Sequence, residues 1–310
     1  MIRTAAVLGG GAVARALLKA LPAAGVAVRA SWNRRSGTAP PPLREVDLVL
    51  LAVSDGAVAE LCDALDVGRG QLVAHLAGAL GLRPLSSALR KGARTGSLHP
   101  LRAFTAGQPG SFSGAAAGIA GSDSSARRDL AALARRLGLR PLPTREGSRA
   151  LYHAAAVLAA GAQVALFSEA ARAFRKATGA GEKEARAALL PLALGALEKL
   201  RKLTPAAALT GPAARGDLAT IRAHRAALPE DLLDLYDRLT AVAFDLRTPG
   251  AALRTRRAAA SRGSGPETRS SHPRRPPPRA ARPSASSRSR ARYGRRRAPR
   301  PRGPAPRRPR

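Results

Sequence analysis

Short apolar runs alternate with segments of helical period along roughly the first 120 residues of the chain. The apolar runs that predict strands are residues 4–8, 25–32, 46–53, 71–76, 93–98 and 114–120. The run 46–53 is apolar at nearly every position, which is typical of a strand buried on both faces of a parallel sheet. Strands that alternate with helices in this way predict an α/β domain in which helices cover a parallel sheet.

Beyond Gly147 the apolar positions recur at helical spacing. The expected helices are residues 149–176, 182–203, 219–227 and 229–246. Pro191 lies inside the second and is expected to bend it, because proline removes a helical hydrogen bond. An earlier helix, residues 124–137, follows Ser and Asp side chains that suit an N-cap. The pattern predicts an α/β domain over residues 1–147 and an all-helical domain over residues 148–247.

The composition changes at Thr248-Pro249-Gly250, where the ordered chain is expected to end. Residues 251–310 hold 20 arginines and a single acid, Glu267, so most of the net charge of +33 lies there. A segment of Arg, Pro, Ser, Ala and Gly cannot bury enough apolar surface to offset its ordering entropy. We therefore expect a disordered Arg/Pro-rich tail over residues 248–310. It either binds nucleic acid through phosphates or is the product of a GC-rich gene read in a shifted frame.

The single cysteine, Cys62, excludes an internal disulfide framework and fits a reducing cytoplasm. We expect it to be a small buried apolar residue. We expect no membrane span, because no stretch approaches the roughly 20 consecutive apolar residues that a span requires. The best candidate, residues 154–167, is short and contains Gln163. The five histidines are scattered without metal-ligand spacing, and the serine-hydrolase elbow is absent. A soluble protein of the cytoplasm without a metal is expected.

A glycine turn follows the first apolar run and leads into a helical segment. Gly9, Gly11 and Ala14 match the pattern G-x-G-x-x-A, which places a dinucleotide pyrophosphate at a helix N-terminus. Gly9, Gly11, Ala12 and Val13 are therefore candidates for cofactor binding. The alternative is that the glycines only join the strand to the helix. The motif indicates a Rossmann-like parallel sheet.

The second predicted strand ends in Asn33, Arg34 and Arg35, and no acid occurs before Glu45. An NAD-binding domain usually places an acid here for the ribose 2′-hydroxyl. Guanidinium groups instead suit a 2′-phosphate, to which they offer charge and forked donors. The three residues therefore predict NADP rather than NAD. The alternative is a solvated basic loop.

Ligands of open parallel sheets bind beyond the carboxyl ends of the strands. Ser54 follows the third strand and is a candidate for cofactor binding, and Gly78 would let the backbone approach the nicotinamide ring. His75 and His99 are candidate proton donors, because a histidine near its usual pKa of about 6.5 gives or takes protons at neutral pH. His75 could instead lie in the core. His99, expected in a loop before Pro100, is the preferred candidate.

The helical domain adds five candidate groups for the substrate. Tyr152 and His153 begin a nearly apolar helix, where they either face the site or pack against the sheet domain. Arg215 suits a substrate carboxylate, and Asp217 either acts with it or caps the next helix. His224 lies two helical turns further on. The alternative is a buried structural network. The candidate catalytic residues are His99, His153, Arg215 and Asp217.

Four segments resemble a bacterial family of unknown function: residues 75–81, 96–101, 151–156 and 209–217. That family joins a Rossmann-like NADP-binding domain to an all-helical domain. It is related to pyrroline-5-carboxylate reductase, deazaflavin-dependent NADP oxidoreductases and 6-phosphogluconate dehydrogenase. The resemblance covers residues 1–247. Ala14, where the family has Gly, and the tail depart from it.

The resemblance implies an NADP-dependent oxidoreductase with a helical dimerisation domain. Such an enzyme transfers a hydride to or from a small carbonyl, hydroxyl or imine substrate bound between the two domains. The alternative is a non-catalytic NADP-binding sensor or scaffold. The expected partners are a small molecule, a second copy of the chain and, through the tail alone, nucleic acid.

Overall fold

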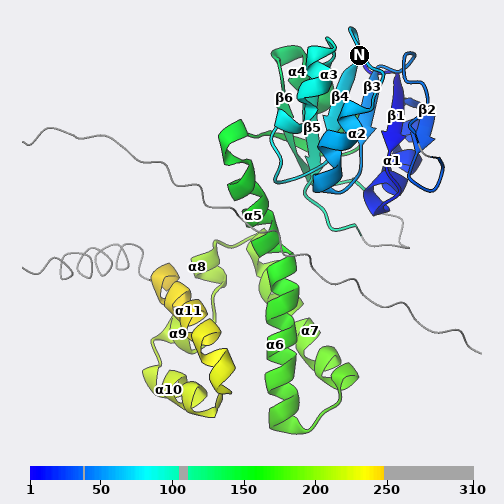
Figure 1. Ribbon diagram of the computed structural model, residues 1–310. Coiled ribbons are helices and arrows are strands. Elements are labelled where there is room, and N and C mark those ends of the chain that lie inside the picture. Colours follow the sequence, from blue (N-terminus) through cyan, green and yellow to red (C-terminus); the bar gives the residue numbers. More distant parts are fainter. Residues whose placement is uncertain (38, 105–110, 248–310) are drawn as a thin grey trace, which may run out of the picture. The chain divides into compact units, whose positions relative to one another are not determined.

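The computed structural model describes residues 1–37, 39–104 and 111–247 (Figure 1). The predicted tail, residues 248–310, and the expected end of the ordered chain lie outside the described residues. The boundary between residues 147 and 148 stays a prediction.

Seven strands form one sheet in the order β2-β1-β3-β4-β5-β6-β7. Their bounds are β1 Thr4–Leu8, β2 Ala27–Trp32, β3 Leu48–Leu51, β4 Leu72–His75, β5 Arg94–Pro100, β6 Ala116–Gly121 and β7 Arg140–Pro143. Neighbouring strands from β2 to β5 pair in parallel, whereas β6 pairs antiparallel with β5 and parallel with β7. The sheet confirms the predicted α/β, Rossmann-like fold. The helices that follow it confirm the predicted helical region.

The sequence did not predict two features of the sheet: the antiparallel pair of β5 with β6 and the strand β7. Strand β6 follows β5 without a crossover helix, which an antiparallel neighbour does not require. Strand β7 was missed because its sequence, Arg-Pro-Leu-Pro, resembles a turn. Proline is tolerated there because β7 is an edge strand of the sheet.

Helices on both faces of the sheet bury two separate apolar clusters. These helices are α1 Ala12–Ala23, α2 Val58–Asp63, α3 Ser86–Arg90 and α4 Ser124–Arg136. Leu17 of α1 and Leu130 of α4 belong to one cluster. Val58 of α2 and Ala88 of α3 belong to the other, together with Cys62, which is buried as predicted. The sheet is thus a middle layer between two helical layers.

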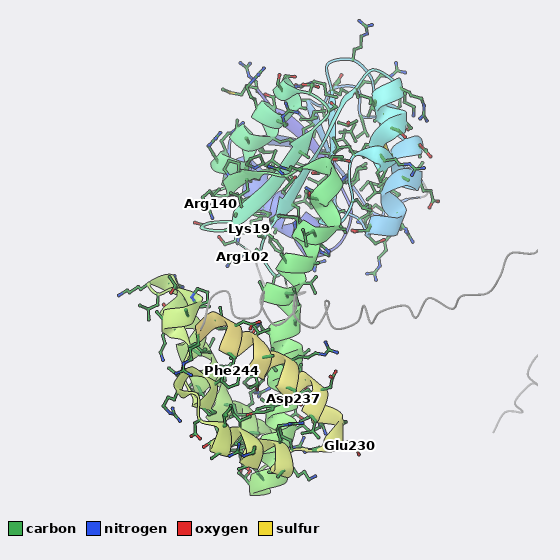
Figure 2. The ribbon with its side chains drawn as sticks, turned by 90° about the vertical axis from the view of Figure 1, so that its left-hand side faces the viewer. Lys19, Arg102, Arg140, Glu230, Asp237 and Phe244 are labelled. Atoms are coloured by element: carbon green, nitrogen blue, oxygen red, sulfur yellow. The ribbon has the colours of Figure 1, made fainter. Side chains whose placement is uncertain are left out.

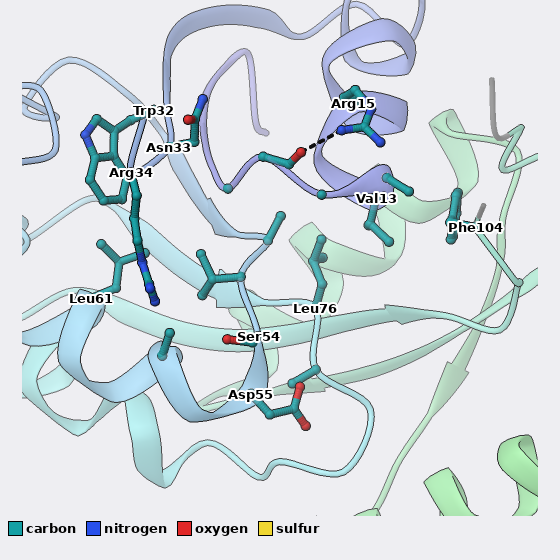
Figure 3. A pocket seen from close by; sticks show the side chains of 18 of the residues that line it. Val13, Arg15, Trp32, Asn33, Arg34, Ser54, Asp55, Leu61, Leu76 and Phe104 are labelled. Carbon is teal, nitrogen blue, oxygen red and sulfur yellow. Dashed lines mark hydrogen bonds between the residues drawn. The ribbon is translucent and has the colours of Figure 1, made fainter. Parts of the chain in front are cut away.

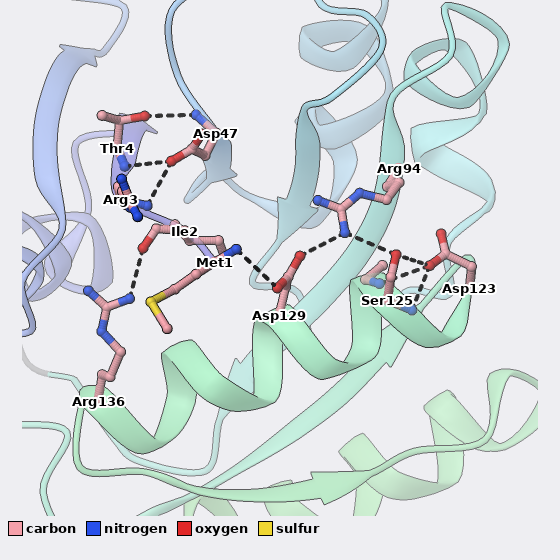
Figure 4. A network of polar contacts seen from close by, with 11 residues as sticks. Met1, Ile2, Arg3, Thr4, Asp47, Arg94, Asp123, Ser125, Asp129 and Arg136 are labelled. Carbon is pink, nitrogen blue, oxygen red and sulfur yellow. Dashed lines mark hydrogen bonds and ion pairs between the residues drawn. The ribbon is translucent and has the colours of Figure 1, made fainter.

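Polar contacts attach α4 to strand β5 and to the residues that precede β1 (Figure 4). Arg94 donates to the Asp129 carboxylate over 2.7 Å, and Arg136 donates to the carbonyl oxygen of Ile2 over 2.8 Å. Asp123 caps the helix, because its Oδ1 accepts hydrogen bonds from the backbone N–H groups of Ser125 and Ala126. The cap predicted for this helix is confirmed, and it belongs to Asp123.

Replacing Asp123 with Ala is expected to lower the free energy of unfolding by about 1 kcal/mol at pH 7. The Ser125 hydroxyl and the Ala126 backbone N–H lower the Asp123 pKa from 3.8 to about 2. A depressed folded-state pKa contributes stability above the unfolded pKa, which is lost as the pH falls from 3.8 to 2. Urea unfolding of Asp123→Ala and wild type should therefore converge in acid. A difference that does not shrink between pH 3.8 and pH 2 would contradict the cap.

The helical region contains seven α-helices among its described residues. They are α5 Arg149–Ala159, α6 Gly161–Thr178, α7 Glu182–Glu198, α8 Pro205–Ala208, α9 Pro212–Arg215, α10 Leu218–Ala227 and α11 Glu230–Arg247. The single helix predicted over residues 149–176 is divided at Ala160, whose φ of −127° and ψ of −74° are not helical. Gly161, a weak helix former, follows this break. Helix α7 continues through Pro191, and Figure 2 shows α11 from Glu230 to Phe244.

Large apolar side chains remain exposed on these helices. Leu151, Val164 and Leu192 are more than 70% exposed, and Leu190, Leu194 and Leu197 are exposed as well. By length and composition the helical segment Glu146–Thr178 is apolar enough to cross a membrane, and none of its most apolar window is buried. Residues 154–167, the best candidate by sequence, lie within this segment, which extends beyond them at both ends. The single chain leaves an extensive apolar surface uncovered.

Candidate functional site

A cavity of about 1350 Å³ opens where β1, β2, β3 and β4 end (Figure 3). This volume exceeds that of most small-molecule pockets and suits a dinucleotide. All residues predicted to bind the cofactor line it: Gly9, Gly11, Ala12, Val13, Asn33, Arg34, Arg35, Ser54 and Gly78. The cavity therefore joins side chains that the sequence suggested separately.

The glycine turn forms one wall of the cavity. Gly9 has a φ of +146°, and a Cβ there would collide with the carbonyl oxygen of Ala52. The backbone N–H of Gly9 donates to the carbonyl oxygen of Trp32 over 2.7 Å, so the turn is attached to the end of β2. Gly11 differs, because nothing lies within 4 Å of a Cβ built on it. Gly9 is required for close packing of the strands, and Gly11 faces open space.

Helix α1 begins at this open space without a side-chain cap. Gly11 is the N-cap, no side chain caps the helix, and no acid stands in its first turn. Arg15 donates to the carbonyl oxygen of Gly10 over 2.7 Å, as the dashed line in Figure 3 shows. The free N–H groups, the helix dipole and the nearby guanidinium all favour an anion at this point.

Basic side chains gather at the end of β2. Arg34 and Arg35 line the cavity beside Trp32, and Figure 3 shows Arg34 extending toward Leu61. The side chain of Asn33 accepts a hydrogen bond from the backbone N–H of Arg35 over 2.9 Å, which orders this turn. The two guanidinium groups are placed to receive a second anion.

Two histidines meet at the opposite end of the cavity. A Cβ on Gly78 would lie 2.8 Å from Nε2 of His99 and would collide with the ring of His153. The two imidazole centroids are 5.7 Å apart, at an interplanar angle of 73°. His99 belongs to strand β5 and not to the predicted loop. Gly78 in the loop after β4, His99 of β5 and His153 of α5 thus form a cluster.

His99 is uncharged at neutral pH. Burial first, and then the nearby His153, Arg149 and His75, lower its pKa to about 4. Its Nδ1 lies 3.0 Å from the hydroxyl of Tyr152. The assumption of an ordinary histidine pKa is therefore wrong at this position, since a charged imidazolium is not available near pH 7.

Arg149 is a buried neighbour of this histidine cluster that the sequence analysis did not select. It is 2% exposed and donates to the carbonyl oxygens of Ala77 and Leu80 and to the Thr144 hydroxyl. Its guanidinium lies 5.5 Å from the centroid of the Tyr152 ring. A charged residue that opens a nearly apolar helix was the available signal, because such a group requires buried partners.

His75 lies inside the sheet and does not line the cavity. Its Nε2 is 2.9 Å from the carbonyl oxygen of Gly81, and burial lowers its pKa. Of the two alternatives for this residue, the structure places it in the core.

Arg215, Asp217 and His224 do not line the cavity either. Asp217 caps α10 by accepting a hydrogen bond from the backbone N–H of Thr220 over 3.0 Å. His224 pairs with the hydroxyl of Tyr236 over 2.8 Å. The catalytic roles of Arg215 and Asp217 stay predictions. Among the described residues, no group of three or more His, Cys, Asp or Glu side chains could hold a metal.

Comparisons with known proteins support the fold and the family resemblance. Residues 115–242, from β6 to α11, match the family model "Domain of unknown function (DUF2520)". No curated protein sequence matches significantly.

Solved structures share the fold at low identity. A Bacteroides fragilis protein assigned as an NADP oxidoreductase is 22% identical, with a TM-score of 0.61 over 79% of this chain and 98% of that one. A Thermotoga maritima protein is 20% identical, with a TM-score of 0.62 over 78% and 98%. A 1-pyrroline-5-carboxylate reductase from Streptococcus pyogenes is 16% identical, with a TM-score of 0.50 over 78% and 98%. The predicted resemblance is confirmed.

Proposed function

We propose that this chain, whose DUF2520 domain completes a Rossmann-like sheet, is an NADP-dependent oxidoreductase of the cytoplasm. It would transfer a hydride to or from a small carbonyl, hydroxyl or imine substrate. One observation carries the proposal: a single cavity joins a glycine turn, a basic turn after β2 and a histidine cluster. The solved structures of NADP oxidoreductases with this fold support it.

Each part of the cavity suits one part of NADP. The N-terminus of α1 at Gly11 would hold the pyrophosphate, and Arg34 and Arg35 would hold the 2′-phosphate. The nicotinamide would then extend past Ser54 toward Gly78. The residues present fit the cofactor, since the anionic groups meet helix N–H groups and guanidinium groups.

The histidine cluster would act on the substrate atom that gains charge when the hydride is transferred. Bound NADPH would supply a hydride, and a carbonyl or imine that accepts it would develop negative charge on its oxygen or nitrogen, which then takes a proton from water. His99 and His153 would donate hydrogen bonds to that atom and so stabilise the transition state. Arg215 and Asp217 would act on the substrate only in an assembly that brings them to the cavity.

The test is a calorimetric titration of the full chain with NADPH and with NADH. Changing Arg34 and Arg35 together to Ala should weaken NADPH binding by about 10- to 100-fold, because charged hydrogen bonds contribute about 1.5–3 kcal/mol. NADH binding should be poor and unchanged. Arg44→Ala is the control, since Arg44 is exposed and pairs with Asp66 outside the cavity. Absent NADPH binding, or equal affinity for both cofactors, would contradict the proposal.

The second candidate is a non-catalytic NADP sensor or scaffold. The low pKa of His99 favours it, because an uncharged imidazole is a poor proton donor. Consumption of NADPH with any carbonyl or imine compound would decide for the enzyme. A nucleic-acid role of the tail belongs to this second candidate as well.

We also propose a homodimer assembled through the helical region. The exposed leucines of α5 and α7 support this, because large contiguous apolar patches usually mark interaction surfaces.

A further inference from the structure

We propose that Tyr152 is a positioning residue that fixes His99 in the tautomer with its proton on Nε2, so that His99 meets the substrate as an uncharged hydrogen-bond donor. The inference rests on the proposed function, since it concerns the histidine end of the same cavity. It is carried by the surroundings of the Tyr152 hydroxyl.

The Tyr152 hydroxyl has one proton and two acceptors within reach. It lies 3.0 Å from Nδ1 of His99 and 3.4 Å from the carbonyl oxygen of the same residue. The second distance is long for a hydroxyl donor. Its one close acceptor is therefore Nδ1 of His99, to which the hydroxyl donates its proton.

The structure holds Tyr152 in this position from several sides. Gly118 lies opposite His99 in the β5–β6 pairing, and a Cβ on it would be 2.5 Å from the phenol oxygen. Only glycine leaves room for the ring there. The buried Arg149 faces the Tyr152 ring, with its guanidinium 5.5 Å from the centroid.

The tautomer of His99 follows from this arrangement. A neutral imidazole has one N–H, so a ring whose Nδ1 accepts a hydrogen bond carries its proton on Nε2. That Nε2 lies beside Gly78, where it lines the cavity. Burial, His153, Arg149 and His75 all disfavour the charged ring. The proton therefore points toward the site of the substrate.

This arrangement assigns a specific role to His99. An imidazole that stays neutral does not act as a conventional general acid, but it polarises a carbonyl or imine by donating a hydrogen bond. Tyr152 keeps the donor available by preventing the other tautomer. The cavity would therefore favour substrates in which charge develops on a single oxygen or nitrogen.

The tautomer is measurable without a substrate, by ¹⁵N NMR of the histidine rings in the full chain. Wild type should show His99 uncharged at pH 7 with its proton on Nε2. Tyr152→Phe should allow the Nδ1–H form to become populated. Tyr236→Phe is the matched control, because Tyr236 makes the same type of contact with Nδ1 of His224. That variant should leave the His99 signals unchanged.

Two results would overturn the inference: an Nδ1–H tautomer in wild type, or a His99 ring in Tyr152→Phe that remains purely Nε2–H. Circular dichroism checks that both variants fold. Titration of the same samples with NADPH separates this inference from the proposed function. A fixed Nε2–H tautomer without NADPH binding refutes the oxidoreductase alone, whereas NADPH binding with an Nδ1–H ring refutes only the role of Tyr152.

Discussion

Replacing Gly11 with Asp is expected to abolish NADPH binding while leaving the protein as stable as wild type. Gly11 is the N-cap of α1, with a φ of −74° that any residue adopts, and its Cβ position faces open space. Asp is a preferred N-cap residue, so the free energy of unfolding should change by only a few tenths of a kcal/mol. The substitution therefore separates cofactor binding from folding.

The loss of binding has an electrostatic cause. A carboxylate at Gly11 would occupy the helix N–H groups and would repel the pyrophosphate. Two unit charges 4 Å apart repel by about 4 kcal/mol at an effective dielectric constant of 20. This corresponds to roughly a 1000-fold weaker affinity.

Calorimetry and urea unfolding of the same samples test both parts of this prediction. Gly11→Asn is the matched control, because Asn caps a helix equally well without the charge. It should retain more affinity than Gly11→Asp. An Asp variant that binds NADPH as wild type does would show that the glycine turn only joins β1 to α1.

The strand and helix pattern was predictable from sequence wherever local apolar runs determined it. Strand β1 has its predicted bounds, and α10 and α11 differ from theirs by single residues. Strand β7 was not predictable, because its Arg-Pro-Leu-Pro sequence resembles a turn and only the pairing with β6 makes it a strand. The break at Ala160 was missed although Gly161, a weak helix former, follows it. The sequence also indicated the cavity wall, since Gly9, Arg34 and Gly78 all follow strands at one edge of the sheet.

The histidine end of the site was only partly predictable. The sequence selected His99 and His153, but it could not show that Tyr152, 53 residues away, bonds to His99. The low pKa of His99 depends on burial and on Arg149, which come together only in the fold. Residue type and position thus suggested a proton donor, whereas the environment indicates a neutral hydrogen-bond donor.

Changing Leu190 and Leu194 together to Glu is expected to convert a dimer into a monomer. The two residues lie one helical turn apart on α7, and both are exposed in the single chain. In a symmetric dimer each substitution occurs twice. Burial of a leucine contributes about 1.5–3 kcal/mol, so the dissociation constant should rise by roughly 10⁴-fold or more.

Analytical ultracentrifugation of the full chain without detergent measures this change. Leu89→Glu is the matched control, because Leu89 is 52% exposed on α3, outside the helical region. It should have the same association state as the wild type. A wild-type monomer would refute the dimer. A wild-type chain that disperses only in detergent would instead assign the apolar segment Glu146–Thr178 to a membrane. Loss of the dimer in the α7 variant alone would show that a second copy covers the exposed leucines.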